Sequence, residues 1–192
     1  MLNKIKSALR GNAQKTESNV GKWKRNYDGL SEIKTYADET SYRLAAAFLD
    51  GLESVEDWGC GSGGFRLFCK SPYIGVDGTE NPFVDKVADL ATYRSDADGI
   101  LLRHVLEHNP AWEKILDNAL QSFRKKLCIV VFTPFADETK VIEYYRKMDV
   151  VDISFEREDL VSRFAPFRWT SEEDLRTDSQ YDVEHVFYIE RD

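Results

Sequence analysis

Apolar positions recur at helical spacing in the second fifth of the chain, which predicts a helix over residues 40–49 with Thr40 or Ser41 as its N-cap. A short apolar strand over 54–58 follows. A glycine-rich turn at 59–64 then separates this strand from the next element. The order of strand, turn and helix is typical of one βα unit.

The same alternation continues toward Pro134. A second apolar helix is expected to start near Phe65, and a third is predicted over 112–123. The continuous apolar run at 127–132 is typical of a strand that is buried on both faces. Further short strands are expected at 73–76, at 87–90 and at 99–102. Alternation of this kind predicts a largely parallel sheet covered by helices, with ligands at the carboxyl ends of its strands.

The end of the chain has a different pattern, with strands expected at 167–169 and 183–190. The polar loop between them leaves no room for a crossover helix, so they are expected to form an antiparallel hairpin at one edge of the sheet. The fold class is therefore α/β, with a mostly parallel seven-stranded sheet and helices on both faces.

The length of 192 residues and the hydrophobic content of 42% suit one globular domain. We divide the chain into a basic N-terminal arm and possible lid, 1–39, and a single domain, 40–192. Residues 1–26 carry seven Lys or Arg against the single Glu17. Such an arm could touch RNA, an acidic membrane or a partner, but we favour a frayed tail or a helix that lies on the protein's own acidic surface.

Several classes are disfavoured by composition. No apolar run approaches the roughly 18 residues of a membrane span, and no secretory signal is evident, so a cytoplasmic location is expected. The cysteines Cys60, Cys69 and Cys128 include no C-x-x-C pair, which argues against a disulfide framework or a thiolate zinc site. The acidic body also argues against a DNA partner.

The candidate chemistry concentrates where the strand at 54–58 runs into the glycine turn. Glycines there let a backbone pass close to a ligand, although a tight turn without ligand has the same pattern. The spacing of Gly59, Gly61 and Gly64 also fits a dinucleotide site, with Asp77 as a ribose contact. Asp57 immediately before the loop would repel a diphosphate but would attract a cationic cofactor.

Residues 57–63, DWGCGSG, resemble the first motif of class I S-adenosylmethionine-dependent methyltransferases, with Trp58 in place of the usual aliphatic residue. The resemblance continues in IGVDG at 74–78 and in ADL at 88–90. The segment 98–108, DGILLRHVLEH, is similar to the fourth-strand motif of the small-molecule branch.

This resemblance covers roughly residues 40 to 135 and implies a Rossmann-like fold with S-adenosyl-L-methionine as cofactor. It implies that Asp77 receives the ribose hydroxyls, that Asp89 accepts from the adenine amine and that Tyr36 contacts the cofactor carboxylate. The expected cofactor-binding residues are Tyr36, Asp57, Gly59, Cys60, Gly61, Gly63, Asp77, Gly78, Asp89, Leu90 and Arg103.

Methyl transfer from a sulfonium mainly needs alignment, and an alcohol acceptor gains from a general base. His104 is the candidate base, with an ordinary pKa, and its other interpretation is a packing or capping histidine. Trp23 and Tyr27 could form a lid over the cofactor or an apolar helix face. Phe135 is expected in a loop that contacts the acceptor.

The acceptor is expected to be a small molecule, a sugar or a glycan intermediate. His104, Glu107 and His108 are also similar to the metal-binding cluster of small-RNA 2′-O-methyltransferases, but that family has a Glu at the place of His104 and a further downstream histidine. The remaining histidine here is His185, so no metal is expected. A noncatalytic adenosyl-binding module and a nicotinamide-dependent reductase stay as alternatives, and the reductase lacks a Tyr-x-x-x-Lys pair.

Overall fold

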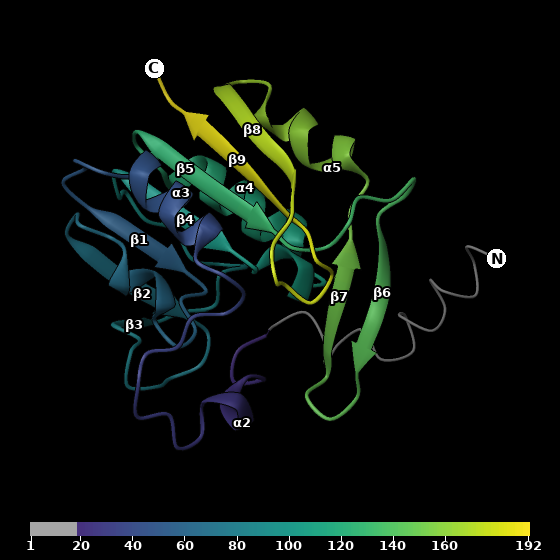
Figure 1. The fold of residues 1–192 in the computed structure, drawn as a ribbon. Helices are drawn as coiled ribbons and strands as arrows, with labels where there is room; N and C mark the ends of the chain where they lie inside the picture. Colours follow the sequence, from purple (N-terminus) through teal and green to yellow (C-terminus); the bar gives the residue numbers. More distant parts are fainter. Residues whose placement is uncertain (1–18) are drawn as a thin grey trace.

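The computed structural model describes residues 19–192, and the expected apolar helix face at Leu2, Ile5 and Leu9 lies outside them. The main sheet has the strand order β3-β2-β1-β4-β5-β9-β8 (Figure 1). Its strands are β1 (Val55–Trp58), β2 (Tyr73–Asp77), β3 (Lys86–Val87), β4 (Gly99–Arg103), β5 (Lys126–Val131), β8 (Arg168–Leu175) and β9 (Glu184–Glu190). The first five run parallel, whereas β9 is antiparallel to both β5 and β8. The predicted seven-stranded sheet with an edge hairpin is confirmed.

Helices cover both faces of this sheet, as Figure 1 shows for α3 (Thr40–Phe48) and α4 (Trp112–Ser122). Successive residues of β4 point to opposite faces, so Ile100 packs in the core with α4 whereas Leu101 packs in the core with α3. The continuous apolar runs in β4 and β5 are explained by this burial on two faces.

Two local expectations are wrong. Gly64–Leu67 form only a 3-10 turn, η1, because few residues and then Pro72 separate it from β2. Neither Thr40 nor Ser41 caps α3. The Thr40 amide donates to Oδ1 of Asp38 at 2.8 Å instead.

A second sheet follows β5 and was not foreseen. It consists of β6 (Lys140–Tyr145) and β7 (Val150–Ser154), which pair in antiparallel fashion beside the main sheet. β7 packs beside the 3-10 turn η2 (Leu106–His108). The helix α5 (Arg157–Val161), followed by the 3-10 turn η3 (Ser162–Phe164), then leads to β8.

The short helix α2 (Lys24–Tyr27) lies near the turn between β6 and β7, at the bottom of Figure 1. Arg25 Nη1 donates to the carbonyl oxygen of Lys147 at 3.4 Å, which joins these two segments. None of the helices within residues 19–192 has the length and apolar character needed to cross a membrane.

Candidate active site

A cavity of about 430 Å³ opens at the carboxyl ends of β1, β2, β4 and β5. This volume falls in the range of small-molecule sites, roughly 300–1,000 Å³. The candidate base His104 lines it, as do all but one of the expected cofactor-binding residues, namely Tyr36, Asp57, Gly59, Cys60, Gly61, Asp77, Gly78, Asp89, Leu90 and Arg103. These residues therefore lie together around one cavity.

The glycine loop needs its glycines at two positions along the cavity wall. Gly59 has a φ of 79°, and a Cβ there would lie 2.4 Å from Cγ2 of Val105. Gly61 has a φ of 52°, and a Cβ there would lie 3.0 Å from the Tyr27 hydroxyl. Gly63 does not line the cavity, because it faces Phe83 on the other side of the loop. Side chains in this loop would thus fill the space that the backbone leaves open.

Two buried carboxylates form the polar floor of the cavity. Asp57 accepts a hydrogen bond from the Tyr73 hydroxyl at 2.8 Å, and burial raises the pKa of Asp57 to about 7. Asp77 accepts from the amides of Gly61 at 3.0 Å and Thr79 at 2.7 Å. Burial raises the pKa of Asp77 as well. Asp77 therefore also holds the glycine loop in place.

The predicted adenine contacts lie beside the floor. Asp89 Oδ1 accepts from the Ala91 amide at 3.0 Å, and the Leu90 carbonyl accepts from Nδ2 of Asn118 at 2.8 Å. Cys60 is buried, and this burial raises the pKa of its thiol, which keeps it protonated.

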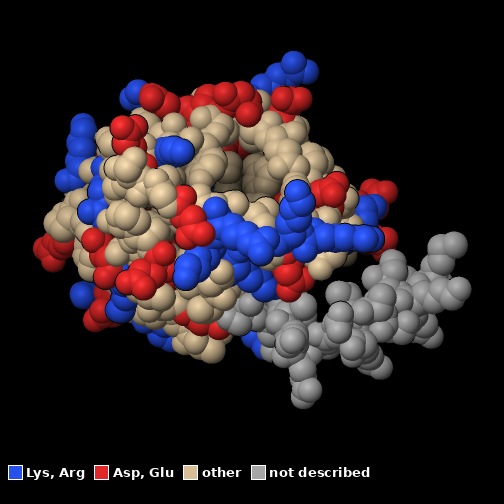
Figure 2. Space-filling model, turned by 90° about the horizontal axis from the view of Figure 1, so that it is seen from below, with Lys and Arg blue, Asp and Glu red and all other residues tan. Residues whose placement is uncertain are grey.

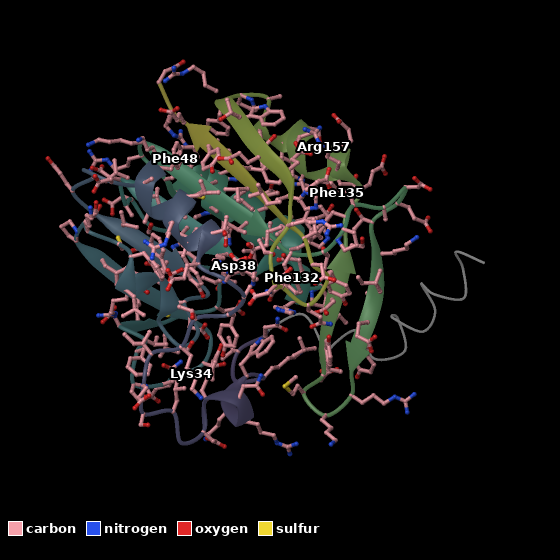
Figure 3. All side chains as sticks on the ribbon, in the orientation of Figure 1. Lys34, Asp38, Phe48, Phe132, Phe135 and Arg157 are labelled. Carbon is pink, nitrogen blue, oxygen red and sulfur yellow. The ribbon has the colours of Figure 1, made fainter. Side chains whose placement is uncertain are left out.

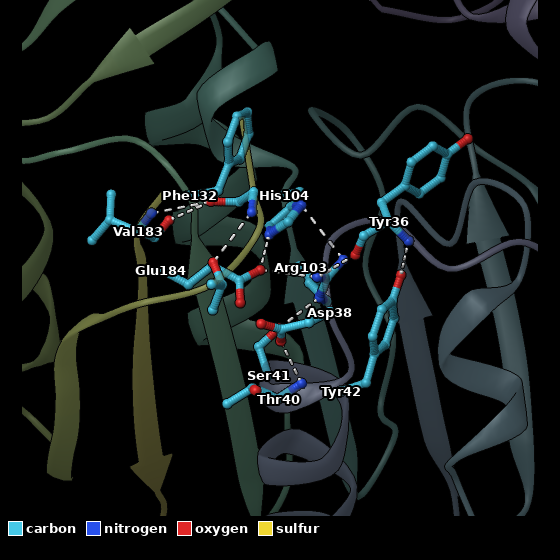
Figure 4. Close-up of polar contacts among 12 residues, drawn as sticks. Tyr36, Asp38, Thr40, Ser41, Tyr42, Arg103, His104, Phe132, Val183 and Glu184 are labelled. Carbon is cyan, nitrogen blue, oxygen red and sulfur yellow. Dashed lines mark hydrogen bonds and ion pairs between the residues drawn. The ribbon is translucent and has the colours of Figure 1, made fainter. Parts of the chain in front are cut away.

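Arg103 is held rigidly at the end of β4 (Figure 4). Its Nε donates to Ser41 Oγ at 2.9 Å, and its Nη2 donates to the Tyr36 carbonyl at 2.8 Å. The guanidinium carbon lies 3.8 Å from the centre of the Tyr42 ring. The Tyr36 side chain itself is 50% exposed at the cavity mouth.

His104 follows Arg103 in a left-handed conformation, with a φ of 56°. Its Nε2 lies 2.5 Å from Oε1 of Glu184, and its Nδ1 lies 3.4 Å from Nη1 of Arg103. Burial, with the nearby charges of Arg103 and His108, lowers the pKa of His104 well below its usual value. The pKa of His104 therefore differs from the ordinary value expected, because burial and the adjacent Arg103 charge disfavour the imidazolium.

Glu184 was not among the predicted residues. It is fully buried on β9, where its Oε1 also accepts from Arg103 Nη2 at 2.9 Å. Burial raises the pKa of Glu184. Glu184 lies outside the segment that carries the family resemblance. The sequence around it does not indicate that its carboxylate pairs with Arg103 and His104, which are about 80 residues away.

The opposite wall of the cavity comes from segments that flank the main sheet. Tyr27 lines it from α2, and Trp23 lines it from the position just before α2. Their action as a lid stays a prediction. Tyr145 and Met148 line it from the second sheet, which sequence analysis missed. Gln180 completes this wall.

Phe135 is not part of the lining, so the expected acceptor contact is wrong. Its ring lies 4.1 Å from the ring of His185, between centroids. Phe132 takes its place in the cavity. Figure 3 shows Phe132 beside the loop that precedes β9, where its ring stacks on Tyr181 at 5.8 Å.

Basic side chains gather at the cavity mouth. Figure 2 shows a band of Lys and Arg along one side of the hollow, on the face that carries α2 and the β6–β7 turn. The turn, α2 and the residues just before α2 carry Lys22, Lys24, Arg25, Arg146 and Lys147, which we call the basic rim. Lys22 Nζ pairs with Oδ2 of Asp149 at 3.2 Å and so ties the rim together. The rim contrasts with the net charge of −8 of the whole chain.

Within residues 19–192, no group of three or more His, Cys, Asp or Glu side chains is arranged to hold a metal ion. Glu107, which the sequence analysis compared with a metal-binding cluster, is buried. Its Oε1 accepts from the Phe132 amide at 2.6 Å. Burial raises the pKa of Glu107 to about 7.

No family model matches the chain, and no curated protein matches its sequence. Solved structures do match. The 1,6-didemethyltoxoflavin-N1-methyltransferase of Burkholderia thailandensis, solved with 1,6-didemethyltoxoflavin and S-adenosylhomocysteine, is 20% identical with a TM-score of 0.62, over 80% of this chain and 79% of that one. The magnesium protoporphyrin IX methyltransferase of Synechocystis PCC 6803, solved with S-adenosylmethionine, is 17% identical with a TM-score of 0.57, over 80% and 79%. The N-terminal domain of EvdMO1, solved with S-adenosylhomocysteine and D-fucose, is 13% identical with a TM-score of 0.57, over 87% and 94%.

The fold is that of class I methyltransferases. In this methyltransferase fold the chain order reverses between β1 and β4, and the cavity lies at that switch point.

Proposed function

We propose that the chain is a cytoplasmic S-adenosylmethionine-dependent methyltransferase that methylates a hydroxyl group of a small molecule, a sugar or a glycan intermediate. One observation carries this proposal. A single cavity joins the glycine loop and the acids Asp57 and Asp77 to two histidines, His104 and His108, near the end of β4.

The residues of the cavity floor fit a cationic cofactor without phosphates. Asp57 would attract an ammonium or sulfonium, Asp77 would accept from ribose hydroxyls, and Asp89 would accept from the adenine amine. When bound, S-adenosylmethionine supplies an activated methyl group on sulfur. Several solved structures of this fold contain S-adenosylmethionine or its demethylated product, which supports the same choice here.

The protein's part in the reaction is alignment and proton removal. The cavity walls exclude water and orient the acceptor oxygen for an in-line attack. A histidine would then receive the hydroxyl proton, and His104 and His108 both line that part of the cavity. His104, the residue proposed from the sequence, is held by Glu184 and Arg103.

The basic rim supports an acceptor that carries negative charge, such as a phosphate or carboxylate group. Its cations flank the lining residues Trp23, Tyr145 and Met148 directly in the sequence. Cations at a cavity mouth raise the local concentration of an anionic substrate.

Calorimetry tests the cofactor, with S-adenosylhomocysteine expected to bind and NAD not to bind. Rate measurements test the chemistry, with replacement of both histidines by alanine expected to slow transfer by about 10² to 10⁴ while cofactor affinity stays nearly constant. Tight NAD binding would favour the reductase alternative. An unchanged transfer rate would show that the acceptor needs no base and that the protein acts by alignment alone.

The RNA 2′-O-methyltransferase alternative predicts a metal requirement. Chelation with EDTA is expected to leave the transfer rate unchanged. Loss of the rate in EDTA and its recovery with Mn²⁺ or Mg²⁺ would put that alternative first.

A further inference from the structure

His108 is a second histidine at the cavity, and its ring is held through Nδ1. Its Nδ1 hydrogen-bonds to the Val151 carbonyl at 3.1 Å and lies 2.9 Å from Oδ1 of Asp152. A carbonyl can only accept, so Nδ1 carries a proton and, in the neutral ring, the lone pair is on Nε2. The side chain is 17% exposed and lines the cavity, where Trp23 packs against its ring at 4.9 Å between centroids.

Asp152 is a fully buried carboxylate on β7, and other residues hold it in position. Its Oδ2 accepts from the hydroxyls of Tyr145 and Tyr181, both at 2.9 Å, and from Nε2 of Gln180 at 3.3 Å. Three donors on one oxygen stabilise the ionised carboxylate, and the other oxygen lies within 2.9 Å of His108 Nδ1. The second sheet therefore brings an oriented negative charge to the imidazole.

His104 is engaged differently. Its Nε2 is bound to Glu184, and its Nδ1 faces the Arg103 guanidinium. Protonation of His104 would place a second positive charge beside Arg103 in a buried site, which is unfavourable. Of the two rings, only His108 combines a carboxylate partner with a nitrogen left for the acceptor.

We propose that His108 is the general base of the methyl transfer, with Asp152 as a positioning residue, and that the acceptor is an alcohol or phenol bound against His108 Nε2. This inference rests on the proposed function. The acceptor O–H bond breaks and its proton moves to Nε2. The acceptor oxygen forms the O–CH₃ bond with its electron pair while the S–CH₃ bond breaks, and sulfur leaves as a neutral thioether. The imidazolium, paired with Asp152, then returns the proton to solvent.

The electrostatics of the two histidines differ in a measurable way. Burial alone would lower the pKa of His108, but Asp152 and Glu107 more than offset this and raise its pKa above 6.5. The titratable or charged groups that face it are Asp152 from β7, Glu107 and His104 from its own segment, and the hydroxyls of Tyr145 and Tyr181 around Asp152. A base must be neutral to act, so a reaction that depends on His108 gains rate as pH rises through a value above 6.5. A reaction that depends on His104 would already reach its full rate well below pH 6.5.

The test is the pH profile of single-turnover transfer from labelled S-adenosylmethionine to the acceptor-containing fraction of a host extract. The wild-type rate is expected to rise with pH through a pKa above 6.5, and we call this rise the acid limb of the profile. Asp152→Asn should move this limb down by about one to two pH units, because it removes the charge that stabilises the imidazolium. Glu138→Gln neutralises an exposed carboxylate just before the same hairpin, outside the cavity and without contact to His108, and should leave the limb in place. His108→Ala should lower the rate by about 10² to 10⁴ with unchanged S-adenosylhomocysteine affinity.

An acid limb below pH 6.5 in the wild type would overturn the inference without the need for any variant. An unshifted limb in a folded Asp152→Asn protein, or a His108→Ala rate within about threefold of wild type, would also overturn it. In these cases methyl transfer itself persists, and the proposed function stands. A wild type that binds S-adenosylhomocysteine but labels no fraction would overturn both.

Discussion

Nε2 of His104 lies 2.5 Å from Oε1 of Glu184, a contact between residues 80 positions apart in the sequence. Glu184 Oε1 also accepts from Arg103, so one buried oxygen ties the end of β4 to the start of β9. The contact positions two predicted site residues by means of a third that no motif contains.

Glu184→Gln should destabilise the protein by about 3 kcal/mol, because it leaves the buried Arg103 guanidinium without its counter-charge. Urea unfolding measures this loss. Glu39→Gln is the control, since its pair with Arg43 is exposed and should contribute less than about 0.5 kcal/mol. Equal losses in the two variants would show that the buried network does not stabilise the site.

Asp77→Ala should weaken S-adenosylhomocysteine binding by about 2 to 3 kcal/mol, because two charge-assisted hydrogen bonds to the ribose are lost. The same variant should also have a lower melting temperature, since Asp77 accepts hydrogen bonds from the Gly61 and Thr79 amides. Asp85→Ala is a matched control, because Asp85 accepts from the Gly75 amide outside the cavity. Calorimetry that finds equal affinity in the two variants would refute the role of Asp77.

Cofactor affinity should depend on pH through Asp57. Burial raises the pKa of this group to about 7, so at pH 6 it is largely protonated and attracts a cation less than at pH 8. The affinity for S-adenosylhomocysteine should therefore rise between pH 6 and pH 8. Asp57→Asn should bind more weakly and with no such rise. A wild-type affinity that is flat over this range would contradict the assignment.

The basic rim should control acceptor affinity rather than the chemical step. Arg146→Glu is expected to raise KM for the acceptor at least about threefold with little change in kcat, and added salt should raise the wild-type KM. Lys70→Glu makes the same charge change on an exposed residue outside the cavity. If both variants give the same KM, the acceptor is not recognised by charge.

The predictable part of the site comes from residues close together in the sequence, at the ends of neighbouring strands and in the glycine loop. Gly59 and Gly61 sit between a buried strand and a turn, and their role follows from the space that a Cβ would occupy. Asp77 ends β2 and Asp57 lies one residue before the end of the neighbouring parallel strand β1, so their proximity follows from the sheet order. Local periodicity also placed both helices that cover the sheet, because each has one strongly apolar face.

The remainder depends on long-range contacts. Lys140–Tyr145 is a largely exposed strand without a clear apolar face, so its pairing with β7 gives little periodic signal. Asp152 and Glu184 act through partners distant in sequence, and a buried carboxylate is recognised only when its donors are known. Ser41 looked like a helix cap, but its hydroxyl is taken by Arg103.

The most direct test of the central claim is incubation of the purified protein with methyl-labelled S-adenosylmethionine and a fractionated extract of its native host. The account predicts that label appears in a small, negatively charged molecule as a methyl ether, without added metal. Label in RNA that requires a metal ion, or no transfer by a protein that still binds S-adenosylhomocysteine, would contradict it.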